Sequence, residues 1–350
     1  MASKTIYILH KNGAPSHYYG LEHLAIENGW EVKFREFSVV SKLYKGIIKG
    51  RFSQVKKQLV NAGFLLVLLF SSNKKIVLGI APFDSKLGTL LPFLKKHQIY
   101  YHTSWTCWDK SFHPKRKNNS EKAFQTWKAF LEHLVQHIFT VTRKSRQSIL
   151  ENYSVSHDKI SVVYHSLHLA YETHTSQEKI PNSFIYVGRL DKGKGIEALL
   201  TFFSEDSKAM LTIVGDGKLE TTVKEYSSNY NNIIFKGYVS DKSALKKLFA
   251  QHKFLVLNSQ KTETWEELFG LIIIEGMSQG TLPIAPMHSG PNEIIDPCFG
   301  YLFEEGTISA TLAKLVTEGG FTAEKSQKAR EASQQYATEV ISKKWHSILN

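Results

Sequence analysis

Cysteine is scarce in this 350-residue chain, which holds only Cys107 and Cys298, far apart in the sequence. With so few thiols, and with a strand-like segment at residues 5–10 where a secreted protein would carry its leader, we expect a reducing cytosolic location and no disulfide. Long apolar runs are missing as well, because the longest, FLLVLLF at residues 64–70, falls far short of the ~20 residues that cross a bilayer. The sequence therefore predicts no transmembrane segment.

Signals of a metal site or of nucleic-acid recognition are absent too. No D-x-D motif occurs anywhere in the chain, and no cluster of His, Cys and Asp has the spacing of metal ligands. We therefore expect no metal and no other cofactor. The chain also lacks a recognition module for nucleic acid, so nucleic acid is not an expected partner.

Acidic residues are few in the first half only. Residues 1–175 hold 25 Lys and Arg against 11 Asp and Glu, a net charge of +14, whereas residues 176–350 hold 19 against 21, a net charge of −2. Residues 42–58 (KLYKGIIKGRFSQVKKQ) interleave six of these cations with apolar side chains, which is the composition of a segment on an anionic membrane surface. The alternative is a solvated helix face with an ordinary buried side. We expect a cytoplasmic protein attached peripherally to the inner face of the cell membrane through this basic half.

Strand-like and helix-like segments alternate along both halves, which predicts an α/β fold of two doubly wound parallel sheets. The first half contains two short apolar runs, at residues 63–70 and 75–81, and good helical spacing over residues 120–139. A polar, linker-like stretch at residues 172–183 precedes a fresh strand, and residues 324–349 form a single long helical pattern. The expected divisions are an N-terminal domain over 1–175, a C-terminal domain over 176–330 and a closing helix over 331–350.

Residues 187–201 (VGRLDKGKGIEALLT) approach the P-loop pattern G-x-x-x-x-G-K-[ST], but Gly195 stands where a Ser or Thr would hold magnesium. A P-loop is therefore not expected. Arg189 and Lys194 flank a turn that follows a strand, and the planar fork of an Arg and the point charge of a Lys both suit a diphosphate. The alternative is a solvated basic turn ahead of a helix.

Two glutamates in the later stretch 263–295 flank a predicted helix start near Phe269–Gly270. Free backbone N–H groups at such a start favour an anion. Glu275 would lie about 7 Å further along the axis at ~1.5 Å per residue, where it could reach a sugar diol, and Glu267 could accept hydrogen bonds from a second sugar. A buried glutamate without a partner is costly, so Glu275 should have one. Glu263 and Glu266 are expected to be solvated.

Several segments in order, GRLDKGKG, VGDG, FKGYVS, the spaced glutamates, EGMSQGTLPIAP and SGPNE, resemble the retaining glycosyltransferases of family 4, the glycosyl transferases group 1. The resemblance is specific over residues 184–295 and thinner over the first half. It implies a GT-B fold of two Rossmann-like domains facing a central cleft, with a C-terminal helix packing back toward the N-terminal domain. The N-terminal domain would bind the acceptor, and the C-terminal domain the nucleotide sugar. The implied activity is metal-independent transfer of a hexosyl group, by family prevalence from a UDP-sugar, to a glycan or lipid-linked acceptor in surface polysaccharide or glycolipid synthesis.

The resemblance also implies roles for individual residues. In the second half, the diphosphate would be held by Arg189 and Lys194, the donor-sugar hydroxyls by Glu267, the ribose by Glu275, the base by Tyr238 or Val239, and the sugar and phosphate by the backbone amides of Phe269, Gly270 and Leu271. In the first half, Gly13 matches the loop that lets the donor approach the backbone, and His102 matches a residue beside the reacting sugar. The alternative for His102 is a histidine packed at a strand end. The expected catalytic residues are thus His102, Glu267, Arg189 and Lys194.

The chain departs from the family pattern in its first half. The usual paired glycines are replaced by NGAPS at residues 12–16, and VVYHSLHL stands where an Asn-Gly-Val-Asp stretch is expected. The loss of paired glycines keeps open a second interpretation, a catalytically inactive GT-B partner or a glycan-binding protein.

Overall fold

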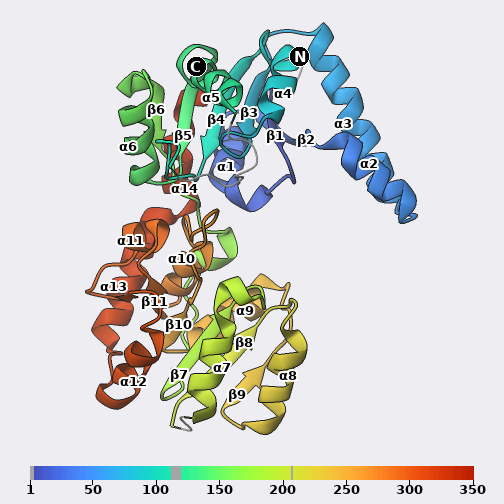
Figure 1. The fold of residues 1–350 in the computed structure, drawn as a ribbon. Helices are drawn as coiled ribbons and strands as arrows, with labels where there is room; N and C mark the ends of the chain where they lie inside the picture. The colour runs from blue at the N-terminus through green and yellow to red at the C-terminus, as the bar shows by residue number, and fades with distance from the viewer. Residues whose placement is uncertain (1–3, 112–119, 206–207) are drawn as a thin grey trace. The chain divides into compact units, whose positions relative to one another are not determined.

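The computed structural model describes residues 4–111, 120–205 and 208–350, and Figure 1 shows its ribbon. The chain forms two compact units, one made of residues 1–166 with 338–350 and the other of residues 167–337. Each unit is a parallel sheet covered by helices, so the predicted α/β fold class with two doubly wound sheets is confirmed.

The first unit contains a six-stranded parallel sheet in the order β2-β1-β3-β4-β5-β6. Its strands are β1 (Lys4–His10), β2 (Trp30–Glu36), β3 (Lys75–Gly79), β4 (Gln98–Thr103), β5 (Val135–Thr140) and β6 (Ile160–Val162). Its helices are α1 (Tyr19–Glu27), α2 (Val39–Ile48), α3 (Phe52–Phe70), α4 (Lys86–Leu94), α5 (Glu121–Ala129) and α6 (Arg143–Asn152). The strands β3 and β4 are almost wholly buried, as apolar runs covered on both faces should be.

The second unit contains a six-stranded parallel sheet in the order β12-β11-β10-β7-β8-β9. Its strands are β7 (Ser183–Val187), β8 (Met210–Val214), β9 (Ile233–Phe235), β10 (Phe254–Val256), β11 (Leu282–Pro286) and β12 (Tyr301–Phe303). Its main helices are α7 (Ile196–Glu205), α8 (Glu220–Asn229), α9 (Lys242–Gln251), α10 (Leu271–Ser278), α11 (Ser289–Ile294), α12 (Ile308–Glu318) and α13 (Ala323–Ser333). The strand order reverses between β7 and β10, and ligands of such sheets bind beyond the carboxyl ends of the strands at this reversal.

The closing segment is interrupted, so the prediction of one long helix is wrong. After α13 come a 3₁₀ turn (Gln334–Tyr336), the short helix α14 (Thr338–Ser342) and a 3₁₀ segment (Lys343–Ile348), with extended backbone at Ala337. The reason is that the segment belongs to two cores: Tyr336 packs against Phe269 of the second unit, and Trp345 packs against Phe139 of the first. Helix α14 contacts α1, as expected of the C-terminal helix. The two helices approach closely at Gly20 of α1, where an added Cβ would lie 2.9 Å from Ile341 of α14.

The apolar run at residues 63–70 forms the end of helix α3. One further prediction of an element needs correction. The helical spacing over residues 120–139 holds only for α5 and a π-helical turn (Phe130–Leu134), after which the chain becomes strand β5. Strand β5 pairs with β4 and β6 on its two sides, and this burial overrides the local helical pattern.

Candidate functional site

The turn after strand β7 is shaped by a glycine that has no room for a side chain. Gly195 closes the 3₁₀ turn Lys192–Lys194 in the left-handed region, with φ 63°. A Cβ at this position would lie 2.2 Å from the backbone oxygen of Asn258, whose side-chain amide donates to the Gly195 carbonyl at 2.9 Å. The hydroxyl residue that a P-loop needs is therefore sterically excluded here.

Lys194 lies beside Glu267, although the two come from separate parts of the sequence. The Lys194 Nζ is 2.8 Å from Glu267 Oε2, donates to Ser259 Oγ at 3.1 Å and lies 4.4 Å from the ring centroid of Trp265. Both charged side chains are largely but not fully buried. This cation and carboxylate stand beyond the ends of β7 and β10, where the strand order reverses. The sequence analysis did not identify Ser259 or Trp265.

Backbone contacts hold the segment that carries Glu267. The Glu267 N–H donates to Nδ1 of His288 at 3.1 Å, and the N–H of Gly290 donates to the Glu267 carbonyl at 3.0 Å. The other ring nitrogen of His288 lies 2.5 Å from Glu305 Oε1. With Nδ1 accepting, the proton of His288 belongs on Nε2, facing the Glu305 carboxylate. His288 therefore orients the glutamate, a role that no sequence pattern indicated.

The neighbouring Glu266 corrects one prediction, because it is buried rather than solvated. Its carboxylate accepts from Ser289 Oγ at 2.8 Å and from the Ser289 N–H at 3.3 Å. Adjacent side chains in extended backbone point to opposite sides, so one acid of this pair is buried when the other faces the site. Glu263 is exposed, as predicted.

Gly290 makes the closest approach to this segment, which gives a test of its packing. A Cβ there would lie 2.3 Å from the backbone nitrogen of Phe269, so that Gly290→Ala must displace the backbone. We expect the variant to lose about 2 kcal/mol of unfolding free energy in urea titrations, as overpacking of a rigid contact does. Gly88→Ala, where a Cβ meets nothing within 4 Å, is the control and should be at least as stable as the wild type, because Ala favours the helix α4 that contains it. Equal stability of the two variants would contradict the described contact.

Helix α10 begins where the sequence predicted a helix start. Its first residue is Leu271, and Gly270 forms the N-cap with φ 93°, without a side-chain hydrogen bond to the helix. The Phe269 ring is buried against Tyr336. The first turn of α10 therefore carries the partial positive charge of an uncapped helix start, next to Glu267.

A pocket of about 310 Å³ lies in the second unit and collects four of the predicted donor-binding residues, namely Arg189, Tyr238, Val239 and Glu275. The other residues that line it are Tyr171, Val187, Gly188, Val214, Gly215, Asp216, Ser240, Lys242 and Leu245. Most of these residues follow the carboxyl ends of β7, β8 and β9 or begin α9. The sequence analysis assigned none of these nine. They include Tyr171 and Lys242, whose ammonium lies 5.6 Å from the Tyr171 ring centroid.

Glu275 reaches the pocket from the middle of helix α10. Burial raises the pKa of its carboxyl to about 7, and the nearby charge of Lys242 offsets only part of that effect. Among the described residues, no side chain or backbone group forms a hydrogen bond with this carboxylate. A half-buried carboxylate that faces a pocket and has no partner fits a ligand that brings hydroxyl groups.

Arg189 and Lys194 do not act on the same neighbours in this structure. The exposed Arg189 guanidinium pairs with Asp191 at 2.9 Å and lines the pocket, whereas Lys194 contacts Glu267. The turn of residues 190–193 joins them, and Tyr186 Oη fixes its start by donating to the Arg189 carbonyl at 2.7 Å. The predicted residues of the second unit thus form two adjoining groups, one in the pocket and one at the start of α10.

In the first unit, Gly13 and His102 lie at the carboxyl ends of their strands. Gly13 follows β1 with φ 87°, a conformation that favours glycine. His102 is in β4 with a buried ring, near the rings of Tyr18 and Trp345 at 5.0 and 5.2 Å between centroids. Burial and the neighbouring His17 and His10 hold its pKa well below the usual value, and its Nε2 has no hydrogen-bond partner in the described part of the chain. His102 is therefore a neutral imidazole, and its role remains a prediction.

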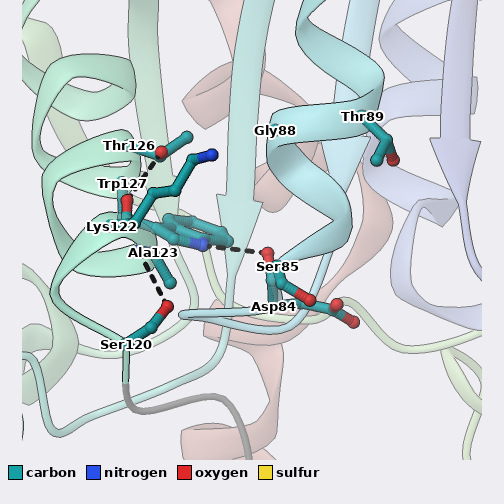
Figure 2. Close-up of a pocket in the computed structure, with 9 residues that line it drawn as sticks. All are labelled: Asp84, Ser85, Gly88, Thr89, Ser120, Lys122, Ala123, Thr126 and Trp127. Carbon is teal, nitrogen blue, oxygen red and sulfur yellow. Dashed lines mark hydrogen bonds between the residues drawn. The ribbon is translucent and has the colours of Figure 1, made fainter.

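A second cavity, of about 450 Å³, lies in the first unit between α4 and α5, as Figure 2 shows. Its lining holds one acid, Asp84, and one cation, Lys122, and the Trp127 indole donates to the Asp84 carbonyl at 3.2 Å. None of the predicted site residues lines this cavity, so the pocket of the second unit is the candidate site. Over residues 4–111, 120–205 and 208–350, no group of three His, Cys, Asp or Glu is placed to hold a metal.

Comparison with known proteins gives one family. Residues 172–338 match the family described as "Glycosyl transferases group 1". No curated protein matches the chain.

Solved structures share the fold at low sequence identity. HepE of Anabaena, solved with UDP, is 14% identical with a TM-score of 0.67, and the match covers 99% of each chain. The lipopolysaccharide outer core galactosyltransferase WaaB is 17% identical with a TM-score of 0.63, again over 99% of each chain. TarM of S. aureus, solved with UDP among other ligands, is 20% identical with a TM-score of 0.60; the match covers 82% of this chain and 59% of the TarM chain. At these identities the likeness establishes the fold.

Proposed function

We propose that this chain, whose residues 172–338 match the glycosyl transferases group 1 and whose fold is shared with solved structures such as HepE, moves a sugar from a nucleotide diphosphate sugar to a hydroxyl acceptor. The observation that carries the proposal is the pair Lys194–Glu267 at the strand-order reversal, beside a pocket that contains Arg189 and the unpartnered Glu275. Cations for a diphosphate and carboxylates for sugar hydroxyls occur together there. For the donor we propose a UDP-sugar, since HepE was solved with UDP and with UDP-glucose.

Within the pocket, the nucleoside would lie against Tyr238 and Val239, with the ribose hydroxyls donating to Glu275. The diphosphate would be held by Arg189, Lys194 and the backbone amides of Phe269, Gly270 and Leu271 at the start of α10. The donor sugar would donate to Glu267, which is already fixed from behind by His288. We also propose that the loop at Gly13 lets the donor approach the backbone.

The chemistry we propose is a retaining transfer without a covalent enzyme intermediate. The bond between the anomeric carbon and the diphosphate oxygen breaks, the electron pair leaves with the diphosphate, and the acceptor oxygen attacks the face that the diphosphate vacates. The leaving diphosphate takes the acceptor's proton. Arg189, Lys194 and the start of α10 would stabilise the growing negative charge by preorganised electrostatics, so that no metal ion is needed.

His102 would act as a hydrogen-bonding group toward the reacting sugar. Burial and two neighbouring histidines keep it neutral, so its Nε2 can donate or accept according to its tautomer. For the acceptor we propose a glycan or a lipid-linked saccharide of surface polysaccharide or glycolipid synthesis. The excess of cations in residues 1–175 supports peripheral attachment to an anionic membrane surface, where such an acceptor is found.

Thermal unfolding in the presence of nucleotides tests the donor site. We expect UDP to raise the melting temperature of the full chain, since a ligand at 100 times its Kd adds about 2.7 kcal/mol to the unfolding free energy. GDP and ADP at equal concentration are the comparison, and a larger effect of GDP would change the base but not the class of donor. No effect of any nucleoside diphosphate or its sugar would contradict the proposal.

A further inference from the structure

Helix α3 turns six of its apolar side chains outward, although Phe64 and Leu68 are buried. Its buried positions include two amides, Gln58 and Asn61, whereas Phe52 and Phe70 at its two ends are 84% and 88% exposed. At 3.6 residues per turn, its exposed apolar residues fall within an arc of about 120°. This stripe consists of Phe52, Leu59, Val60, Leu66, Val67 and Phe70.

The inverted orientation has a cause in the polar contacts of α3. Glu36 at the end of β2 is buried and accepts hydrogen bonds from Lys57 at 2.8 Å, from Gln58 at 2.8 Å and from Lys42 of α2 at 2.9 Å. Burial alone would raise the pKa of Glu36, but these three hydrogen bonds outweigh it and lower the pKa to about 2. The buried face of α3 thus combines these polar contacts to β2 with Phe64 and Leu68, and a second apolar face is left outward.

Helix α2 also exposes apolar side chains on one face. Its exposed apolar residues are Val40, Tyr44, Ile47 and Ile48, with the spacing i, i+4, i+7 and i+8 of one helix face. The two helices pack together where Gly46 meets Val55, a Cβ on Gly46 being 3.2 Å from Val55 Cγ2. Figure 1 shows α2 and α3 beyond β2, which is the edge strand of its sheet. We call residues 39–70 the α2–α3 segment.

The charge of this segment has one sign. Residues 37–83 contain no Asp or Glu. Among the described residues, no carboxylate lies within ion-pair distance of Lys45, Lys49, Arg51 or Lys56. A second copy of the chain on this surface would bring these cations together without a compensating acid, which disfavours self-association. An anionic lipid surface supplies both an apolar layer and phosphate charges.

We propose that the α2–α3 segment lies in the interface of an anionic phospholipid bilayer, with its apolar stripe among the acyl chains and its cations on the lipid phosphates. This inference rests on the proposed function, which places the acceptor at a membrane. The apolar contact and the basic residues are the two signals that stable peripheral binding requires. Helix α3 is about 28 Å long at ~1.5 Å per residue. None of the helices described here is long and apolar enough to cross a membrane, so α3 would lie along the surface.

Flotation of the full chain with vesicles tests this orientation. We expect binding to vesicles of phosphatidylcholine mixed with phosphatidylglycerol, little binding to phosphatidylcholine alone, and weaker binding at high salt. The double variant Phe52→Ser/Phe70→Ser should reduce binding to the anionic vesicles by about tenfold or more. The control is Ile26→Ser, which removes an apolar side chain that is 76% exposed from α1 of the same unit and should bind like the wild type.

Three outcomes would overturn the proposal: a wild-type chain that does not float, a Phe52→Ser/Phe70→Ser variant that floats like the wild type, or a wild-type dimer that this variant converts to a monomer. The third outcome would make the stripe a contact between copies. UDP thermal shifts of the same variants separate the two proposals, because both phenylalanines lie in the first unit and the donor pocket lies in the second. A wild-type chain that does not float but gives a normal UDP shift rejects the membrane contact only, and a wild-type chain that floats without a UDP shift rejects the donor site only.

Discussion

The Lys194→Ala variant should transfer sugar about 100-fold more slowly than the wild-type chain at saturating donor, the size of effect seen when one preorganised group that stabilises a developing anion is removed. Lys194 is held in place before any donor binds, by Glu267 at 2.8 Å, Ser259 at 3.1 Å and the Trp265 ring. The Lys194 ammonium therefore needs little reorientation to stabilise the negative charge of the leaving diphosphate. The measurement is the initial rate of UDP release in the presence of acceptor, with the donor above its KM.

The matched control for this experiment is Lys192→Ala, which removes an exposed lysine from the same turn. We expect it to keep the wild-type rate, which separates the position of Lys194 from the general positive charge of the turn. Glu267→Ala should also lower the rate, since it removes the proposed acceptor for the donor-sugar hydroxyls and one partner of Lys194. Near-normal rates in both Lys194→Ala and Glu267→Ala would reject the assignment of this pair.

The Glu275→Gln variant should unfold at a higher temperature than the wild type at pH 8 and yet bind UDP about tenfold more weakly, the cost of losing a hydrogen bond to a charged group. Burial raises the pKa of Glu275 from its usual 4.5 to about 7 in the folded chain. The folded state thus holds this proton more tightly than the unfolded state does. The stability that it contributes is complete below pH 4.5 and is lost as the pH rises through about 7.

The raised pKa of Glu275 predicts how the stability and the UDP affinity of Glu275→Gln should change with pH. Gln has no charge to bury, so its advantage in unfolding free energy should be small at pH 5 and grow to roughly 2 kcal/mol at pH 8. UDP binding should show the opposite preference, because the ionised carboxylate is the better acceptor for ribose hydroxyls. The difference in UDP affinity between wild type and variant should therefore widen from pH 6 to pH 8. Glu225→Gln, on the exposed face of α8, is the control for both measurements. An unchanged melting temperature and UDP affinity in Glu275→Gln would exclude the proposed role of this carboxylate.

The sequence by itself determined the local parts of the site. The alternation of strands and helices indicated two doubly wound sheets, and the start of α10 at Leu271 followed from the apolar pattern after Gly270. Gly195 was recognised as incompatible with a P-loop because the missing hydroxyl is visible in the sequence. These features depend on neighbours in the chain, so a local pattern is enough to predict them.

The contacts between segments were decided by the tertiary structure alone. Lys194 meets Ser259, and Glu267 is oriented by His288, because parallel strands bring their carboxyl ends together regardless of distance in the sequence. No periodicity encodes which of Glu266 and Glu267 is buried. The failure at residues 120–139 has the same origin, since pairing of β5 on both sides outweighs helical spacing.

Helix α3 marks this boundary most clearly. Its sequence showed cations among apolar residues but left two interpretations open, because a helix with apolar residues around most of its circumference does not reveal which face is covered. The tertiary structure settles the orientation through Glu36, whose buried carboxylate binds Lys57 and Gln58 and so turns Leu66 and Phe70 toward solvent. The decisive interaction is a hydrogen-bonded buried charge more than twenty residues from the helix positions it binds. A pattern of apolar residues along the helix cannot show this interaction, because the charge lies outside the helix.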